Sequence, residues 1–365
     1  MKTRKSLSAL VVATALLLSS CATSHVKSNN DAKVNNAPKN VIVMIGDGMG
    51  PAQVYSLLLT SDNTTSFERF PYSGLVITKS ASNEITDSAA GGSAIATGKK
   101  TRNGMIGMTP DSIPVPSMLD YFAGQGKKTG VVVTCYVAHA TPAAFIAHNI
   151  NRKNYEEIAL EISERDDINV LIGGGKKHFT ERKDAINLVD KMWEKGWNVY
   201  DSISQIVDND ARTIVLASEG HLKEAPKRGD FLPDATAKAL EMLDNENGFF
   251  LMVEGSQIDF AGHDNDSTTL VAEMHDFDKT INRVLDFAEK DGNTLVIVTA
   301  DHETGGLTFI DPEGKYTKTN FNFSTGSHSP VFVPIFSFGP GAEEFSGIMD
   351  NTEIISKIME LMKLK

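Results

Sequence analysis

The stretch Val41–Gly50, VIVMIGDGMG, decides the fold class of this chain. Five apolar residues follow one another without a break and lead directly into a Gly-Asp-Gly turn. A run that is apolar at every residue, rather than at alternate residues, is typical of a strand that is covered on both faces. The stretch therefore predicts a buried strand that ends at Asp47.

Similar short apolar runs recur along the chain and alternate with helical patterns. Further strands are expected at Gly74–Thr78, Gly130–Thr134, Val170–Ile172, Thr213–Leu216, Phe249–Val253, Leu295–Thr299 and Pro334–Phe338. Helices are expected between them, for example at Asn154–Ser163, Pro233–Asp244 and Leu270–Lys290. This alternation favours an α/β fold with a doubly wound, mostly parallel central sheet and helices on both faces.

Composition and charge narrow the function classes. The 365 residues are 41% hydrophobic and 22% charged, and no Pro/Gly-rich linker divides residues 40–365, so one domain is expected there. The formal net charge of −12 argues against nucleic acid as a binding partner, because non-specific affinity for nucleic acid comes from basic residues. An acidic protein that handles an anionic substrate needs local positive charge, and bound metal ions are one source of it.

The N-terminus has the pattern of an export signal. A basic segment precedes the apolar run Leu7–Leu18, which is too short to span a bilayer. The next residues, Leu18–Cys21 (LSSC), resemble a bacterial lipoprotein cleavage site, and a plain secretory signal cut nearby is the alternative. We expect a signal peptide over residues 1–20, lipidation of Cys21 and a flexible tether over 21–39. The protein would then be exported and anchored in the membrane on the periplasmic side.

Cys135 is the one other cysteine in the sequence. If Cys21 is lipidated, no disulfide within the chain can form. Because Cys135 lies in an apolar run, we interpret it as a small buried hydrophobic residue rather than a reactive thiol.

Acidic residues follow three of the expected strands. The first strand ends at Asp47, the strand Phe249–Val253 leads into Glu254, and the strand Leu295–Thr299 leads into Asp301 and His302. Ligands of doubly wound folds bind at the carboxyl ends of the strands. A helix cap explains one such acid but not three, so the sequence predicts a metal site at this edge. A dinucleotide-binding loop or a plain turn is the alternative at Asp47, and a carboxylate facing a pyrophosphate disfavours the first.

A second motif, Asp87–Ala94 (DSAAGGSA), predicts a helix rich in small residues with Ser88 at its N-terminus. Backbone N–H groups and the helix dipole would stabilise an alkoxide or a phosphate there. The plain alternative is a serine N-cap. No Gly-x-Ser-x-Gly elbow is present, so acyl-transfer chemistry is not indicated.

A third motif places Asp259 and His263 four residues apart, on one face of a turn or helix. That spacing suits two ligands of one metal ion. A single histidine is more often a structural residue, so the prediction depends on the whole group.

Taken together and in this order, IGDGMG, DSAA, VEG with Asp259 and His263, and TADH resemble the alkaline phosphatase family. The resemblance extends from about Val41 to Gly341. Single motifs are loosely shared with sulfatases and phosphomutases, but the set is highly specific. It implies a metal-dependent phosphomonoesterase that forms a phosphoserine on Ser88 and releases inorganic phosphate, with two zinc ions and one magnesium ion per chain.

The resemblance also implies the ligands of each ion. Those of the first zinc ion would be Asp259, His263 and His328. Those of the second, beside Ser88, would be Asp47, Asp301 and His302. Magnesium would be held by Asp47, Thr141 and Glu254, with His139 contacting its shell through water. These ligand types agree with the known preferences of the ions: zinc binds nitrogen and carboxylate oxygen, and magnesium binds hard oxygen ligands.

Arg152 would clamp the phosphate, since a guanidinium can bind two phosphate oxygens at once. A straight helix from Thr141 would place Arg152 about 16 Å away. The chain must therefore bend, for example at residues 149–151, or the long side chain must reach back.

Three features depart from the family pattern. His139 stands where many bacterial members have aspartate, and a neutral ring there should weaken the magnesium site. Phe260 stands where others carry Lys, His or Trp. Only 25 residues separate His302 from His328, so the family's crown insertion must be very small and dimer contacts inferred from it are in doubt.

A sulfatase or a phosphodiesterase on the same fold is the nearest alternative. The residues after Ser88 lack the sulfatase Pro/Ala-x-Arg context, Arg152 argues against a diesterase, and Phe260 argues weakly for one. A non-enzymatic phosphate-binding lipoprotein would not need Ser88 near a metal. The expected partners are small phosphate monoesters and, through the lipid anchor only, the membrane; a homodimer stays open.

Overall fold

The computed structural model describes residues 37–207, 212–314 and 319–364, and Asn36–Lys365 form one compact unit. The predicted signal peptide, the lipidation site Cys21 and most of the predicted tether lie outside the described residues. Among the helices that are described, none combines the length and the apolar character needed to cross a membrane.

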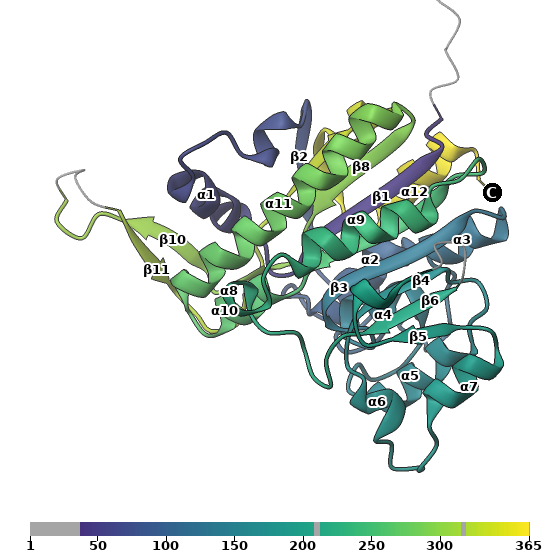
Figure 1. Cartoon of the computed structure of the whole chain (residues 1–365). Helices are drawn as coiled ribbons and strands as arrows, with labels where there is room; N and C mark the ends of the chain where they lie inside the picture. Colours follow the sequence, from purple (N-terminus) through teal and green to yellow (C-terminus); the bar gives the residue numbers. More distant parts are fainter. Residues whose placement is uncertain (1–36, 208–211, 315–318, 365) are drawn as a thin grey trace, which may run out of the picture. The chain divides into compact units, whose positions relative to one another are not determined.

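Within the described residues, ten strands form one sheet in the order β14-β2-β13-β8-β1-β7-β3-β4-β6-β5 (Figure 1). The strands are β1 (Asn40–Gly46), β2 (Tyr72–Ile77), β3 (Lys128–Tyr136), β4 (Val170–Gly174), β5 (Asn198–Tyr200), β6 (Thr213–Leu216), β7 (Phe249–Gly255), β8 (Thr294–Thr299), β13 (Val333–Phe338) and β14 (Gly347–Asp350). All pairs are parallel except those that β13 makes with β2 and β8. The predicted mostly parallel sheet is confirmed.

The twelve helices within the described residues connect and cover these strands. They are α1 (Pro51–Thr60), α2 (Ser88–Thr97), α3 (Met118–Gly124), α4 (Ala140–Ile146), α5 (Tyr155–Glu164), α6 (Lys177–Thr180), α7 (Leu188–Glu194), α8 (Ala225–Arg228), α9 (Phe231–Leu243), α10 (Gln257–His263), α11 (Ser267–Asp291) and α12 (Glu353–Met362). The three helices expected from the sequence correspond to α5, α9 and α11.

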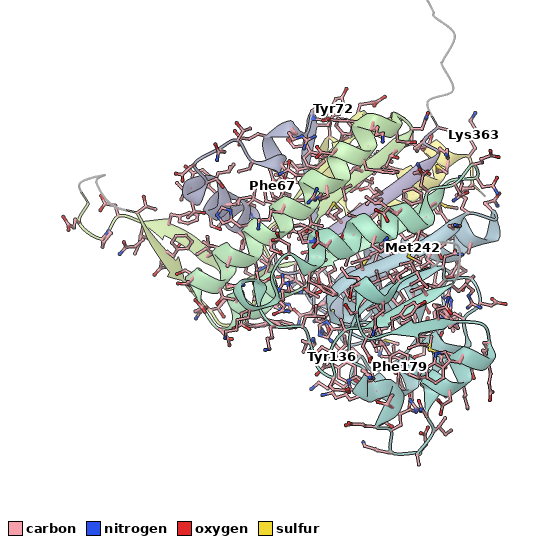
Figure 2. All side chains as sticks on the ribbon, viewed as in Figure 1. Phe67, Tyr72, Tyr136, Phe179, Met242 and Lys363 are labelled. Atoms are coloured by element: carbon pink, nitrogen blue, oxygen red, sulfur yellow. The ribbon has the colours of Figure 1, made fainter. Side chains whose placement is uncertain are left out.

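Two neighbouring phenylalanines on β7 show that helices cover both faces of the sheet. Phe249 packs against Phe287 of α11, with ring centroids 5.8 Å apart, whereas Phe250 packs against Phe122 of α3 at 5.2 Å. Successive side chains of a strand point to opposite faces, so α11 and α3 lie on opposite sides of β7. The long helices α9 and α11 lie in front of the sheet in Figure 1, and side chains fill the space between helices and strands (Figure 2).

The register of the three central strands decides where the site lies. The run Val41–Ile45 is fully buried on β1. Ile45 pairs with Glu254 on β7 and with Thr299 on β8, so all three strands end at the same level. This register brings the residues that follow these strands to one edge of the sheet.

Some of the sequence-based expectations differ from the structure. The segment Gly74–Thr78 corresponds to β2, but it was expected to be covered on both faces, and Tyr72 and Leu75 of β2 are 40% and 36% exposed. It lies next to the edge strand β14, where fewer neighbours cover it. The strands β5 and β14 were not expected, because each has only three or four residues and no continuous apolar run.

The segment between His302 and His328 forms two short antiparallel pairs. β9 (Glu303–Thr304) pairs with β12 (His328–Ser329), and β10 (Leu307–Ile310) pairs with β11 (Asn320–Phe323). His328 lies opposite Thr304 in this register. The hairpin thus returns the chain to the sheet edge from which it left.

Candidate active site

The carboxyl edge of the central strands carries three acidic residues, Asp47, Glu254 and Asp301, and each is 0% exposed. The backbone N–H of Gly48 donates to Oδ1 of Asp301 at 3.2 Å, which ties the end of β1 to the end of β8. Gly48 has a φ of +74°, and a Cβ atom there would lie 2.9 Å from Cα of Asp259. Only glycine allows the loop to close this tightly on α10.

Ser88 is the first residue of α2 and is 1% exposed. Asp87, not Ser88, caps the helix: its Oδ1 accepts from the backbone N–H of Ala90 at 3.0 Å. The alternative of a serine N-cap is therefore wrong. Oγ of Ser88 lies 3.1 Å from Nε2 of His302, and Gly91 lets α2 approach, because a Cβ there would be 2.8 Å from the carbonyl oxygen of Asp301.

Three histidines and Asp259 form a second group beside the acidic edge. Nε2 of His263 lies 3.4 Å from Oδ1 of Asp259, and Nε2 of His328 lies 3.6 Å from the same oxygen. The His328 ring stacks on His302, with centroids 3.5 Å apart. The predicted spacing of Asp259 and His263 thus places both on α10, facing the same point.

Backbone carbonyls fix the orientation of two of these rings. Nδ1 of His263 lies 2.8 Å from the carbonyl oxygen of Gly326, and Nδ1 of His328 lies 2.8 Å from that of Thr86. A carbonyl can only accept, so Nδ1 carries the proton and a neutral ring presents the lone pair of Nε2. The two Nε2 atoms face each other at 3.2 Å. Such converging lone pairs, each oriented by a carbonyl behind it, are typical of metal-binding histidines.

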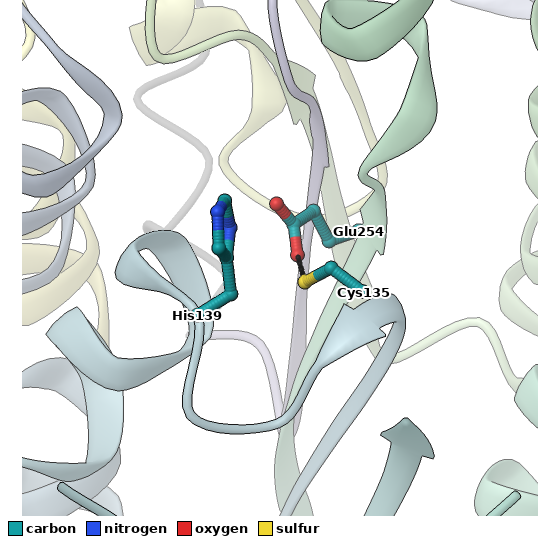
Figure 3. A group of neighbouring side chains, drawn as sticks. All are labelled: Cys135, His139 and Glu254. Atoms are coloured by element: carbon teal, nitrogen blue, oxygen red, sulfur yellow. Dashed lines mark hydrogen bonds between the residues drawn. The ribbon is translucent and has the colours of Figure 1, made fainter. Parts of the chain in front are cut away.

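A third group lies where β3 leads into α4 (Figure 3). It contains Cys135, His139 and Glu254, whose ligand atoms all lie within 4.8 Å of one another. His139 is the N-cap residue of α4, and Thr141 is buried in the first turn of the same helix. Phe260 packs edge-on against His139, with ring centroids 6.0 Å apart.

Arg152 reaches the centre because the chain leaves the helical path after α4, which is the first of the two alternatives that the sequence left open. The helix ends at Ile146, and Nη1 of Arg152 donates to Oδ2 of Asp87 at 3.2 Å. Nη2 lies 3.4 Å from Nε2 of His139. Asp87 thus holds both the helix that carries Ser88 and the guanidinium of Arg152.

Burial dominates the electrostatics of the centre. Burial, and then the nearby carboxylates of Asp301, Asp259 and Glu254, raise the pKa of Asp47 well above its usual value. Burial also raises the pKa of Glu254 to about 7. The pKa of His302 is lowered well below its usual value by burial and then by His328. The positive charge of Arg152 favours the charged form of Asp47, but burial and the neighbouring carboxylates outweigh it.

Hydrogen-bond geometry tests whether metal ions fit this centre. Among the described residues, neither carboxylate oxygen of Asp47 nor Oδ2 of Asp301 accepts a hydrogen bond, although Nε2 of His302 lies 3.2 Å from Oδ2 of Asp301. Buried carboxylates without donors are costly unless a cation binds them. Asp47, Asp301 and His302 have ligand atoms within 4.8 Å of one another, as do Asp259, His302 and His328. The donor sets fit divalent cations, zinc for the groups that contain histidine.

The structure therefore brings together every residue that the resemblance implied within the described part of the chain. The sequence reasoning missed three neighbours. Oγ1 of Thr304 donates to Oδ1 of Asp259 at 2.5 Å, Asp87 holds Arg152, and Cys135 lies beside Glu254 rather than in plain apolar packing. Thr304 and Asp87 could have been found, because each lies within two residues of an implied site residue.

Comparison with known proteins agrees with this arrangement. The family model for alkaline phosphatase matches residues 38–317. The chain is 34% identical to alkaline phosphatase 4 of Bacillus subtilis in an alignment 412 positions long, gaps included, which covers 89% of each protein. The solved alkaline phosphatase of the Antarctic bacterium TAB5 is 40% identical, with a TM-score of 0.87 and coverage of 90% of this chain and 99% of that one. A cold-active alkaline phosphatase of Shewanella is 32% identical, with a TM-score of 0.82 and coverage of 88% and 99%.

Fold and site together define an α/β phosphatase with metal-binding residue groups at the carboxyl edge of its sheet. The chain belongs to the alkaline phosphatase family.

Proposed function

We propose that the protein hydrolyses phosphate monoesters with Ser88 as the nucleophile, by way of a phosphoserine. The observation that carries the proposal is the position of Ser88. Its hydroxyl lies at the N-terminus of α2, 3.1 Å from His302, next to buried carboxylate oxygens of Asp47 and Asp301 that accept no hydrogen bond from the described residues. A purely structural serine would not require that setting.

The residues that would hold metal ions fall into three sets. The first zinc ion would be held by Asp259, His263 and His328, and the second by Asp47, Asp301 and His302. Magnesium would be held by Asp47, Thr141 and Glu254. A solved variant of the TAB5 relative has magnesium bound in a site termed M3, which supports a divalent cation in addition to zinc. When bound, such cations supply positive charge that activates a hydroxyl and stabilises a leaving oxygen.

The chain's own residues bind and orient the substrate. Arg152 offers two parallel N–H groups to two non-bridging phosphate oxygens. The phosphorus then faces Ser88, whose Oγ loses its proton and forms the new P–O bond while the bond to the leaving oxygen breaks and that oxygen takes up a proton to give the alcohol. Free N–H groups in the first turn of α2 stabilise the charge on the phosphoryl oxygens. Water then cleaves the phosphoserine and releases inorganic phosphate.

Trapping the phosphoserine tests this proposal. We expect that acid quenching during turnover of a phosphate monoester, followed by peptide mass spectrometry, shows one added phosphoryl group on the peptide that contains Ser88. A steady turnover with no phosphoryl group on that peptide at any quench time would contradict it. Turnover of a matched phosphodiester under the same conditions separates the monoesterase from the diesterase alternative, since Arg152 favours the dianionic monoester.

We also propose that the protein is exported and held at the membrane by a lipid on Cys21, on the basis of the sequence Leu18–Cys21. Expression in a bacterium fed a labelled fatty acid tests this. The label should appear on the wild-type protein and be lost in Cys21→Ser.

A further inference from the structure

The proposed magnesium ligands leave one residue of the third group without a task. Cys135 lies at the end of β3 and is 0% exposed, and in the metal-free chain its thiol can donate to Oε2 of Glu254 at 3.3 Å or to the carbonyl oxygen of Tyr136 at 3.2 Å (Figure 3). Two ligands of one tetrahedral zinc ion are about 3.5 Å apart, given bond lengths of about 2.3 Å to sulfur and 2.1 Å to oxygen. The sulfur and the carboxylate are therefore already at the separation that a shared ion requires.

His139 supplies a second, independent observation. Its Nδ1 atom is buried and has no hydrogen-bond partner among the described residues, and the same holds for Oε1 of Glu254. Both residues are more than nine-tenths buried, and the ring of His139 faces Glu254 in Figure 3. A buried nitrogen and a buried oxygen without partners, next to a thiol, indicate a missing common partner.

We propose that Cys135, His139 and Glu254 form a sulfur-nitrogen-oxygen site that binds a borderline cation such as zinc in preference to magnesium. The inference rests on the proposed function, because Glu254 belongs to both ligand sets and the two ions compete for it. Magnesium takes oxygen ligands in octahedral geometry, whereas thiolate and imidazole select zinc and cobalt. The thiol proton is released to solvent as sulfur binds the ion.

Binding at this site also changes the contacts of Arg152. Coordination through Nδ1 of His139 leaves the ring proton on Nε2, which then cannot accept a hydrogen bond from the guanidinium. At 3.4 Å that contact is the longer of the two that Arg152 makes, and the 3.2 Å contact with Asp87 is unaffected. Arg152 thus remains held by Asp87 while one N–H group becomes available to phosphate.

Cobalt(II) tests the proposal without relying on activity. The full chain is stripped with a chelator and titrated with Co²⁺, and its absorption spectrum is recorded. A thiolate ligand adds a sulfur-to-cobalt charge-transfer band in the near ultraviolet, distinct from the visible bands of cobalt bound by nitrogen and oxygen. We expect the band in the wild type, its loss in Cys135→Ser and Cys135→Ala, and its retention in the matched control Cys21→Ser.

Competition with magnesium provides the second measurement. Displacing Co²⁺ from this site should require at least tenfold more Mg²⁺ in the wild type than in Cys135→Ser. Circular dichroism and thermal unfolding of the chelated variants show whether they fold.

Visible cobalt bands without the near-ultraviolet band would overturn this inference and leave the proposed function intact. A band that survives in Cys135→Ala would also overturn it. Failure of the wild type to bind any cobalt would overturn both.

Discussion

Two buried acidic groups of this protein are neutralised in different ways. On α11, Glu273 and Asp276 have side chains that are 1% and 6% exposed, and Nη2 of Arg228 lies 2.5 Å and 2.6 Å from their oxygens. At the carboxyl edge of the sheet, Asp47 and Asp301 are equally buried, but Arg152 pairs with Asp87 instead. The structural acidic pair on α11 is neutralised by an arginine of the chain itself. For the acids of the site we propose that a bound metal ion supplies the neutralising charge.

Removing the nucleophile should have the largest effect. Ser88→Ala should leave the fold and metal content unchanged and lower phosphate-monoester turnover by roughly three orders of magnitude or more. Steady-state kinetics at saturating zinc and magnesium measures this.

Ser93→Ala is the matched control, because Ser93 is a buried serine of the same helix whose Oγ accepts from the backbone N–H of Gly107. It should cost about 1 kcal/mol of stability and keep its turnover. A Ser88→Ala variant that retains a tenth of wild-type activity would exclude the covalent route.

Removing Arg228, which neutralises Glu273 and Asp276, should destabilise the protein whether or not metal ions are bound. Arg228→Ala leaves two buried carboxylates unpaired, and the free energy of unfolding should fall by roughly 3–5 kcal/mol. Denaturant unfolding with and without chelator should give the same loss. Lys279→Ala, which removes a pair to Asp230 that is more than half exposed on both sides, should change stability by less than about 1 kcal/mol. If added zinc restored the free energy of unfolding of Arg228→Ala, the acidic pair on α11 would not differ from the acids of the site in how it is neutralised.

Arg152→Ala should lower the preference for monoesters over diesters by at least about tenfold, because a charge-assisted hydrogen bond contributes roughly 1.5–3 kcal/mol. Both substrates are measured on both proteins. Arg69→Ala, which removes surface pairs to Asp286 and Glu289, should keep the wild-type ratio. An unchanged ratio in Arg152→Ala would mean that Arg152 does not clamp phosphate.

The thermal stability of the metal-free protein should depend on pH because of its buried acids, and this effect should be smaller than those of the substitutions above. The pKa of Glu254 is about 7 in the folded chain and about 4.5 for an ordinary glutamate, so the folded state keeps a proton that the unfolded state has lost. Its stability should therefore decrease by a few degrees of Tm as the pH rises from 4.5 to 7.

Metal-loaded protein should show the opposite trend, because protons compete with the ions. Thermal unfolding across this pH range measures both. Glu254→Gln should flatten the metal-free profile, and a profile with the wild-type slope would show that Glu254 is not the group responsible.

The fold and the acids that follow the central strands could be predicted from the sequence because both depend on local patterns. Continuous apolar runs such as Val41–Ile45 mark the central strands, and the acids that follow them reach one edge by register. The strand β5 could not be predicted, since Asn198–Tyr200 gains its strand conformation from pairing with β6 rather than from its own composition.

His328, like His139, Thr141 and Arg152, was assigned to the site through the family resemblance and not through a local pattern. The position of His328 depends on the pairing of β12 with β9, which the 23 residues 305–327 separate, and no local pattern encodes this pairing. Cys135 shows the opposite error. Its apolar neighbours Val131–Val133 predicted burial correctly, but burial alone did not reveal that the sulfur faces Glu254.

Thermal unfolding of one sample before chelation, after chelation and after zinc and magnesium are restored tests the central claim most directly. The account predicts that Tm and phosphatase activity fall together and return together, because clustered buried carboxylates repel one another without cations. Asp47→Asn, which removes one of the repelling charges, should reduce the difference in Tm between the metal-loaded and the chelated protein. A chelated wild-type protein with an unchanged Tm would contradict the claim that cations complete this centre.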